Sequence, residues 1–409
     1  MSRFNDFSRT ASSHQGIRRE NSWWSYTHLD LSLLLMLLAL CSAGLVILYS
    51  ASGQDPGYVE RQMVRMATGF VVMVFIAQFP PRTIMRIGPW LYLLGVLLLI
   101  AVLVVGVGAK GAQRWLPLPG FRFQPSEVLK LVLPIMIAGY LARYALPPSL
   151  KQIAISFILI AVPFALIMKQ PDLGTSLLIG ASGVFVLLFS GIYWRWIFLA
   201  CGVAAASLPG LWMIMKDYQK QRVLTFLDPE SDPLGSGWNI IQSKTAIGSG
   251  GLSGKGFMAG TQSQLDFLPE SHTDFIVAVI GEELGMTGII VLLALYLLII
   301  GRGLVIAVKA PDSFSRMLAA SVTLTFFVYV FVNIGMVSGH WVHKLLVLMV
   351  CVMYSLKLVA RLLLVQPMFQ LIRPLLRLPQ LVVHISLLPN QWFRVIMVGL
   401  EKLAFNQKL

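Results

Sequence analysis

Charged residues are scarce in this sequence. Only 12% of its 409 residues are charged, whereas 57% are hydrophobic. Soluble domains contain about 25% charged residues, so this chain has too few charges to cover a soluble surface. The composition also excludes a disordered chain, a collagen-like repeat, a coiled coil and a secreted disulfide scaffold. What remains is a polytopic membrane protein.

Cysteine and several well-known catalytic motifs are rare or absent. Cys41, Cys201 and Cys351 lie in or beside separate apolar runs and form no CxxC pair, so we interpret them as packed or lipid-facing thiols. There is no HExxH motif, and no serine lies in a GxSxG motif. The glycine-rich stretch 248–256 lacks Walker spacing, since Gly256 follows Lys255 where that motif needs Ser or Thr. This stretch is either a mobile hinge or a loop that brings Lys255 near some other phosphate.

Acidic residues are outnumbered by basic ones, 18 against 32, which gives a net charge of +14. The basic residues lie in short connections between apolar runs, where positive charge sets membrane orientation and attracts anionic lipid. No module that combines basic and aromatic residues is present. We therefore expect the membrane, and not nucleic acid, as the partner of this charge.

Long apolar runs are abundant, and a membrane-spanning helix needs about 20 such residues. The sequence predicts an all-α polytopic membrane protein with about ten transmembrane helices. The runs lie at about 31–50, 66–79, 89–107, 128–146, 153–168, 175–193, 196–215, 275–300, 317–338 and 345–366. The Lys and Arg bias predicts that both termini are cytoplasmic, including a tail at 1–27.

This orientation places one long polar connection, at about 216–274, outside the cytoplasm. A loop of this length usually has a function, so we expect the chemistry at the outer membrane face. Lys110, Arg114 and Arg122 also lie outside, against the usual bias, which indicates a site for anions.

Several ionisable residues lie in or beside the predicted spans, where they are costly and usually functional. Glu127 and Lys130 share one helix face, either as a structural ion pair or with Lys130 offering a cation to an anionic headgroup. Asp172 precedes a predicted helix, where it acts as an N-cap or organises a ligand. Glu282 and Glu283 lie between glycines, and we expect them to pack inside the bundle.

Asp274 is the most informative acid, because it leads directly into the eighth predicted span. A partly desolvated carboxylate at that junction would be more basic and would suit a general base. The alternative is helix capping by Ser271, Thr273 or Asp274 itself. The residues alone leave both roles open.

Ordered blocks across residues 28–339 resemble the RodA branch of the SEDS family (shape, elongation, division and sporulation). They are SASGQD (50–55), KGAQRW (110–115), FQPSE (123–127), QPDLGTS (170–176), QRV (221–223), LDPESDPLG (227–235), IQSK (241–244), IGSGGL (247–252), GTQSQ (260–264), the segment around Asp274, and VNIGMVS (332–338). The rod-shape branch fits these blocks better than its cell-division relative.

This resemblance implies a ten-helix peptidoglycan glycosyltransferase that polymerises lipid II for cell-wall elongation and rod shape. Such enzymes work at the outer face of the bacterial inner membrane, with the elongation machinery and a class B penicillin-binding protein that acts as transpeptidase. The proposed catalytic aspartate of the family falls on Asp274. The alternatives are a lipid II flippase, or a scaffold that activates a transpeptidase without catalysis.

The same resemblance implies that positive charge compensates the departing diphosphate of lipid II. A divalent cation, Mg²⁺ or Mn²⁺, is the alternative to basic side chains, and no cofactor is certain. The candidate substrate-binding residues are Arg114, Glu127, Lys130, Asp172, Arg222, Lys244 and Lys255.

The C-terminal segment 340–409 departs from the family pattern. After Gly339 the Pro-rich segment and the Ser-Tyr-Gly-Gly-Ser turn of the family are missing, and the only acid is Glu401. The segment resembles a replaced C-terminus or a variant with basic amphipathic helices at the membrane surface. A metal-binding role for His340 and His343 rests on weak evidence, because a lone pair three residues apart is common.

Overall fold

The computed structural model describes residues 28–109, 112–118, 121–170, 172–215, 217, 220–221, 224–225, 237–264 and 271–338. The chain divides into two units, Met1–Val350 and Cys351–Leu409, and every described residue lies in the first. The predicted tail 1–27, the tenth span at about 345–366 and the atypical segment 340–409 therefore lie outside the described residues, as does most of the connection 216–236.

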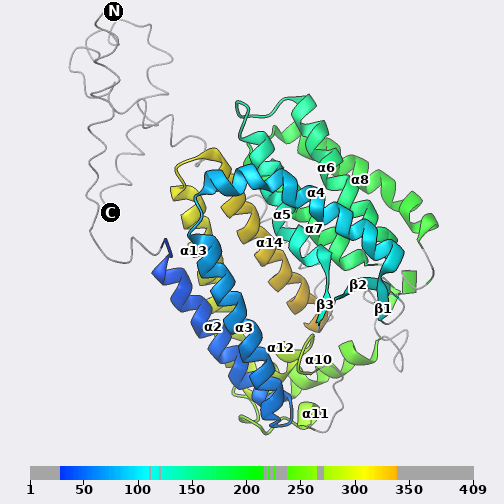
Figure 1. The fold of residues 1–409 in the computed structure, drawn as a ribbon. Coiled ribbons are helices and arrows are strands. Elements are labelled where there is room, and N and C mark those ends of the chain that lie inside the picture. Colours follow the sequence, from blue (N-terminus) through cyan, green and yellow to red (C-terminus); the bar gives the residue numbers. More distant parts are fainter. Residues whose placement is uncertain are drawn as a thin grey trace, which may run out of the picture. The chain divides into compact units, whose positions relative to one another are not determined.

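Long helices make up most of the described chain (Figure 1). They are α2 (Leu31–Ala51), α3 (Pro56–Ala77), α4 (Pro81–Val105), α5 (Pro125–Leu141), α6 (Leu150–Lys169), α7 (Leu173–Phe189), α8 (Trp194–Ile214), α13 (Gly285–Lys309) and α14 (Ser313–Ser338). Among the described residues, the five helices α2, α4, α6, α13 and α14 are long and apolar enough to cross a membrane. A mostly helical, multi-pass membrane protein is confirmed, whereas ten spans remain a prediction.

Short polar side chains determine where several of these helices begin. Asp30 accepts a hydrogen bond of 2.9 Å from the backbone N–H of Leu33 at the start of α2. Asp55 does the same for Gly57 at the start of α3, at 2.8 Å. These bonds satisfy N–H groups that the first turn of a helix leaves without a partner.

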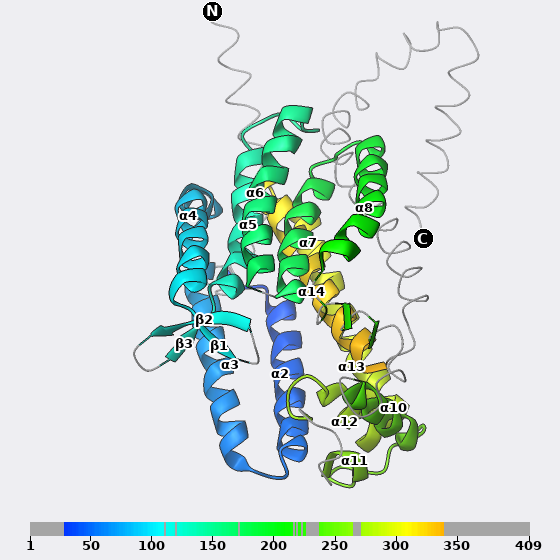
Figure 2. The same ribbon diagram turned by 90° about the vertical axis from the view of Figure 1, so that its right-hand side faces the viewer.

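The largest buried surface lies on α5, which packs against α4, α7 and α14 (Figure 2). Its side chains Leu129, Leu133 and Ile137 are completely buried. Gly95 on α4 allows close approach, because a Cβ atom there would lie 2.7 Å from the Leu129 side chain. This packing fixes the position of α5, whose first turns carry Glu127 and Lys130.

A second cluster of buried apolar side chains joins α2 and α14 to two short helices, α10 (Trp238–Gly250) and α12 (Ile276–Glu283). It includes Ile47, Ala246, Phe275, Val279 and Val337. The cluster holds α12, and with it the turn that carries Asp274, against the C-terminal end of α2.

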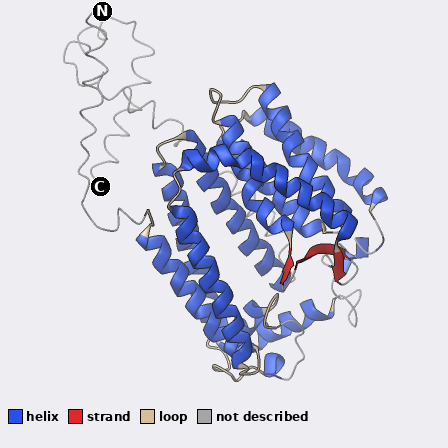
Figure 3. Ribbon diagram, viewed as in Figure 1, coloured by secondary structure: helices blue, strands red, loops and turns tan. Residues whose placement is uncertain are grey.

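The prediction of an all-α fold is wrong at one place, between α4 and α5. Three short strands form an antiparallel sheet in the order β1 (Val107–Ala109), β2 (Ala112–Leu118), β3 (Phe121–Phe123) (Figure 3). Leu116 pairs with Phe123, and Leu118 pairs with Phe121. β1 and β3 have only three residues each, and the sequence of β2, AQRWLPL, does not alternate apolar and polar side chains, so no strand pattern was visible.

The predicted eighth span at about 275–300 is also wrong in its bounds. The chain forms α12, breaks at Leu284, and continues as α13 from Gly285 to Lys309. Gly285 has a φ of +65°, and a Cβ atom there would lie 2.7 Å from the carbonyl oxygen of Leu252. Glycine is the residue that adopts this backbone conformation without steric cost. The presence of Gly285 therefore explains why the helix breaks at this position.

We expect Gly254→Ala to destabilise the fold. Gly254 has a φ of +78°, and a Cβ atom would collide with the carbonyl oxygen of Glu283. The left-handed conformation alone costs an alanine about 1–2 kcal/mol. Thermal unfolding of the purified protein measures the loss. Gly44→Ala is the matched control, since a Cβ atom at Gly44 has nothing within 4 Å; equal melting temperatures for the two variants would contradict the prediction.

An ion pair joins the start of α2 to α13. Arg302 donates to Asp30 from Nε at 3.0 Å and from Nη2 at 2.7 Å. The predicted eighth span ends at about residue 300, but Arg302 and Lys309 both lie inside α13. The Asp30 carboxylate neutralises Arg302, which allows the apolar helix to continue past that residue.

The Asp30–Arg302 pair predicts a pH-dependent contribution to stability. Its hydrogen bond from Arg302 lowers the pKa of the Asp30 carboxyl. The contribution is therefore complete above the unfolded-state pKa of about 3.9 and is lost as the pH falls through the lower folded value. In acid-range thermal unfolding, Asp30→Asn should show less pH dependence than the parent. An identical acid-range slope in both proteins would contradict this.

Candidate functional site

The predicted site residues come from the ends of several elements. Figure 2 shows the three strands below α4 and α5, beside the first turn of α7. The short helices α10, α11 (Thr261–Gln264) and α12 lie by the C-terminal end of α2. The residues therefore form two groups, which we describe in turn.

The first group is a polar cluster of five residues, Arg114, Glu127, Lys130, Asp172 and Tyr329. Lys130 lies at its centre, on α5, with its side chain 8% exposed. Its Nζ lies 2.7 Å from Oε1 of Glu127 and donates a second hydrogen bond to the hydroxyl of Tyr329 on α14. An ammonium group has three donors, so one N–H of Lys130 remains beyond these two bonds.

Arg114 and Asp172 form the other ion pair of the polar cluster. Nε of Arg114, on β2, lies 3.4 Å from Oδ2 of Asp172. Asp172 also caps α7, because it accepts hydrogen bonds from the backbone N–H and the hydroxyl of Thr175, at 3.3 and 2.9 Å. The predicted capping role is confirmed. Asp172 in addition holds the guanidinium of Arg114 on β2 in place through the ion pair.

The two pairs of the polar cluster lie on elements that pack together. The helix α5, which carries Glu127 and Lys130, packs against α7, which Asp172 caps, and against α14, which carries Tyr329. The Lys130 side chain is nearly buried, whereas the side chain of its partner Glu127 is 55% exposed, so the pair lies at the boundary between the interior and the surface. An anion reaching this cluster meets a desolvated ammonium, where electrostatic attraction is stronger than in bulk water.

The second group surrounds Asp274, which lies in the turn before α12. Asp274 is not the N-cap of α12, because that position is Phe275. Within the protein Asp274 is exposed, because the turn carries it away from the apolar face that buries Phe275, so its desolvation at the membrane junction stays a prediction. Among the described residues, nothing forms a hydrogen bond or ion pair with its carboxylate.

The backbone around Asp274 is nevertheless anchored. The hydroxyl of Ser271 donates to the carbonyl oxygen of Ala51 at the end of α2, at 3.3 Å. The ring of His272 packs against that of Tyr58 on α3, with 5.1 Å between ring centroids. Asp274 therefore lies in a turn that is held on α2 and α3, and its carboxylate has no partner among the residues that the structure describes.

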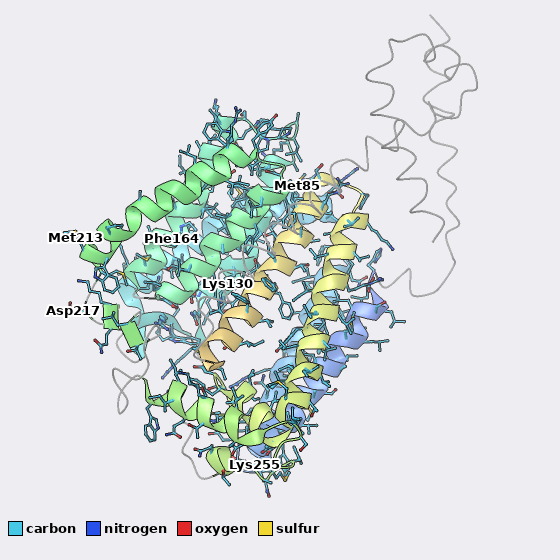
Figure 4. The ribbon with its side chains drawn as sticks, turned by 180° about the vertical axis from the view of Figure 1, so that it is seen from behind. Met85, Lys130, Phe164, Met213, Asp217 and Lys255 are labelled. Carbon is cyan, nitrogen blue, oxygen red and sulfur yellow. The ribbon has the colours of Figure 1, made fainter. Side chains whose placement is uncertain are left out.

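The remaining predicted ligands are not part of the polar cluster. Lys255 and Lys130 lie in different parts of the molecule (Figure 4). Lys255 forms an ion pair with Glu282, at 2.7 Å. Lys244 is half-buried on α10 and forms no ion pair with a described residue. Arg222 lies outside the described residues.

Comparison with known proteins identifies the family of this chain. A family model described as "Cell cycle protein" (FTSW_RODA_SPOVE) matches residues 27–367. The chain belongs to the FtsW/RodA/SpoVE family. The match includes all the residues of both groups, and it extends past Gly339 into the segment where the motif blocks stop.

Two relatives within the FtsW/RodA/SpoVE family support the predicted assignment to the rod-shape branch, because the identity to MrdB is higher than the identity to FtsW. The chain is 54% identical over 321 residues to the peptidoglycan glycosyltransferase MrdB of Escherichia coli K12, covering 78% of this chain and 87% of MrdB. It is 37% identical over 325 residues to a probable peptidoglycan glycosyltransferase FtsW of Trichlorobacter lovleyi, covering 76% and 84%.

Solved structures show the same fold. A chain from a study of how a peptidoglycan synthase complex coordinates polymerization and crosslinking is 30% identical, with a TM-score of 0.68, and the match covers 78% of this chain and 88% of that one. The crystal structure of the rod shape determining protein RodA of Thermus thermophilus is 28% identical, with a TM-score of 0.56, covering 76% and 85%.

Sequence reasoning missed one residue of the polar cluster and one contact of the buried acids. Tyr329 lies in an otherwise apolar run, and a phenol there was the available signal. Ser50 donates a hydrogen bond to the buried carboxylate of Glu283. Glu282 and Glu283 are completely buried, so the prediction that they pack inside the bundle is confirmed. Within the described ranges, no three His, Cys, Asp or Glu side chains are grouped to hold a metal.

Proposed function

We propose that this protein is a peptidoglycan glycosyltransferase that polymerises lipid II into glycan strands for cell-wall elongation. The observation that carries the proposal is 54% identity to MrdB of E. coli, whose name states that activity, over 87% of its length. The two groups of residues described above supply what such a transfer needs, which is a base and a site for a leaving anion.

Asp274 is the proposed general base. In the transfer, the 4-hydroxyl oxygen of the acceptor sugar attacks the anomeric carbon of the donor. The bond from that carbon to the lipid diphosphate breaks, and the carboxylate takes the hydroxyl proton. The carboxylate is not the N-cap of α12 and forms no hydrogen bond or ion pair with a described residue, which supports its availability to the acceptor hydroxyl.

The polar cluster is the proposed site for the diphosphate. Lys130 supplies a buried cation, and Tyr329 and Glu127 hold its ammonium in place. Arg114 supplies a second cation, fixed by Asp172. Positive charge that is oriented in advance stabilises a departing anion without reorganisation during the reaction. Arg222, Lys244, Lys255 and a divalent cation (Mg²⁺ or Mn²⁺) stay alternative sources of that charge.

We further propose a location and a partner. The basic connections support an inner-membrane protein of about ten spans with both termini in the cytoplasm and the 216–274 connection outside. The likeness to a chain of a peptidoglycan synthase complex that coordinates polymerization and crosslinking supports a class B penicillin-binding protein as partner, within the elongation machinery.

The test is glycan-strand synthesis from purified lipid II by the full chain, co-purified with its transpeptidase. We expect polymer from this chain and from a version that carries the usual family C-terminus after Gly339. Polymer from the second version alone would show that segment 340–409 inactivates the enzyme. Lipid II binding by both without polymer would overturn the proposal in favour of a flippase or a scaffold.

A further inference from the structure

A buried carboxylate connects two stretches of chain that flank Asp274. Glu282, in the last turn of α12, is completely buried. Its Oε1 lies 2.7 Å from Nζ of Lys255 and accepts hydrogen bonds from the backbone N–H groups of Thr261 and Gln262, at 2.7 and 2.9 Å. We call these four residues, Lys255, Thr261, Gln262 and Glu282, the clasp.

Backbone hydrogen bonds reinforce the clasp. The N–H of Lys255 donates to the carbonyl oxygen of Glu282, and the N–H of Gly256 donates to that of Glu283, both at 3.0 Å. On the far side of the helix break, the N–H of Met286 donates to the carbonyl oxygen of Gly251, also at 3.0 Å. The stretch after α10 therefore follows the junction between α12 and α13 along its length.

The charge of the clasp depends on Lys255. A buried carboxylate without a counter-charge is costly, and breaking a buried pair by removing one partner is more destabilising than losing a surface pair. Lys255 forms an ion pair with Glu282 at 2.7 Å, and it also donates to the hydroxyl of Thr261, at 2.7 Å. Its removal would take away positive charge that lies directly against the buried carboxylate.

Asp274 lies on the segment that the clasp closes. Lys255 and Glu282 are 27 positions apart, and Asp274 lies between them. Because its carboxylate has no partner among the described residues, its position depends on the backbone on either side. The outgoing side is α12, a short helix of eight residues whose last turn carries Glu282 of the clasp.

We propose that Glu282 and Lys255 are positioning residues for Asp274: by joining the 255–262 stretch to the end of α12, they fix where the turn before α12 places its carboxylate. This inference rests on the proposed function, because it takes Asp274 as the base. It gives Lys255 a role other than the diphosphate ligand expected from the sequence.

The test is steady-state polymerisation of lipid II by the full chain with its transpeptidase. Misplacement of a reacting group by about 1 Å costs up to about a hundredfold in rate. We therefore expect Glu282→Gln and Lys255→Met each to lower kcat at least about tenfold, with KM for lipid II within about twofold of the parent. Lys255→Arg keeps the ion pair and should restore kcat.

Two controls separate positioning from general stability. Asp30→Asn breaks an ion pair at the other end of α2, about 30 Å along that 21-residue helix, and should alter unfolding without changing kcat. If Glu282→Gln lowers the melting temperature but leaves kcat unchanged, the clasp is merely structural and the inference fails. If Lys255→Met raises KM alone, Lys255 is a ligand and the inference also fails.

Failure of the proposed function gives a different result. If Asp274→Asn keeps the parent kcat, Asp274 is not the base, whatever the clasp variants do. If Asp274→Asn is inactive while both clasp variants turn over normally, the positioning role alone is overturned. Should Glu282→Gln fail to fold, Lys255→Met supplies the same test from the exposed side of the pair.

Discussion

Asp274→Asn is expected to abolish glycan polymerisation almost completely. The substitution keeps the size of the side chain but removes the group that accepts the acceptor's proton. General-base catalysis contributes about 10²–10⁴-fold to a rate, so kcat should fall by about that factor. The fold should not suffer, because Asp274 is exposed and makes no hydrogen bond or ion pair with a described residue.

The measurement is strand synthesis from labelled lipid II, together with lipid II binding and a melting curve for each protein. Asp217→Asn is the matched control, since Asp217 is another exposed aspartate of the predicted outer connection and lies far from Lys255 (Figure 4). We expect control and parent to have the same kcat. Turnover by Asp274→Asn within about tenfold of the parent would exclude a general-base role.

The membrane helices were largely predictable because burial in lipid demands long apolar runs. The first predicted span, 31–50, corresponds to α2 (Leu31–Ala51), and the ninth, 317–338, lies within α14. The predicted bounds of the spans were wrong where the helices carry charged residues. α3 begins at Pro56, ten residues before the predicted start at 66. The prediction missed these first turns because they contain Glu60, Arg61 and Arg65 and do not resemble a membrane span.

Long-range contacts account for the other differences. α13 continues through Arg302 because Asp30, 272 positions earlier, neutralises that arginine. No local pattern contains this information. Likewise, the break before Gly285 depends on the backbone of the 251–256 stretch lying against it, which a hydropathy profile cannot detect. Pairing between distant residues has to be seen in a structure.

The site shows the same division between local and distant contacts. The pair Glu127–Lys130 follows from helix spacing, and the Asp172 cap follows from its place before α7. The contact from Lys130 to Tyr329 joins residues 199 positions apart, and the ion pair between Arg114 and Asp172 joins the sheet to the start of α7. Sequence reasoning named four of the five cluster residues, but it did not show that they meet.

Lys130→Met is expected to weaken the binding of lipid II strongly. A hydrogen bond to a charged group contributes about 1.5–3 kcal/mol, so loss of the ammonium–diphosphate contact should raise KM by about 10–100-fold. The cation is desolvated, and no other cation in the described chain contacts Glu127 or Tyr329, so a neighbouring lysine cannot replace it. Methionine keeps most of the apolar stem of the side chain, which preserves packing on α5.

Two controls decide between substrate binding and a structural ion pair. Lys151→Met removes an exposed lysine from the start of α6 and should leave KM unchanged. Tyr329→Phe keeps the ammonium and removes one of its hydrogen bonds, so a smaller increase in KM is expected than for Lys130→Met. If Lys130→Met lowers the melting temperature while KM stays at the parent value, the pair with Glu127 only stabilises the fold. The diphosphate must then be bound elsewhere, because a cation that contacts the substrate cannot be removed without a cost in affinity.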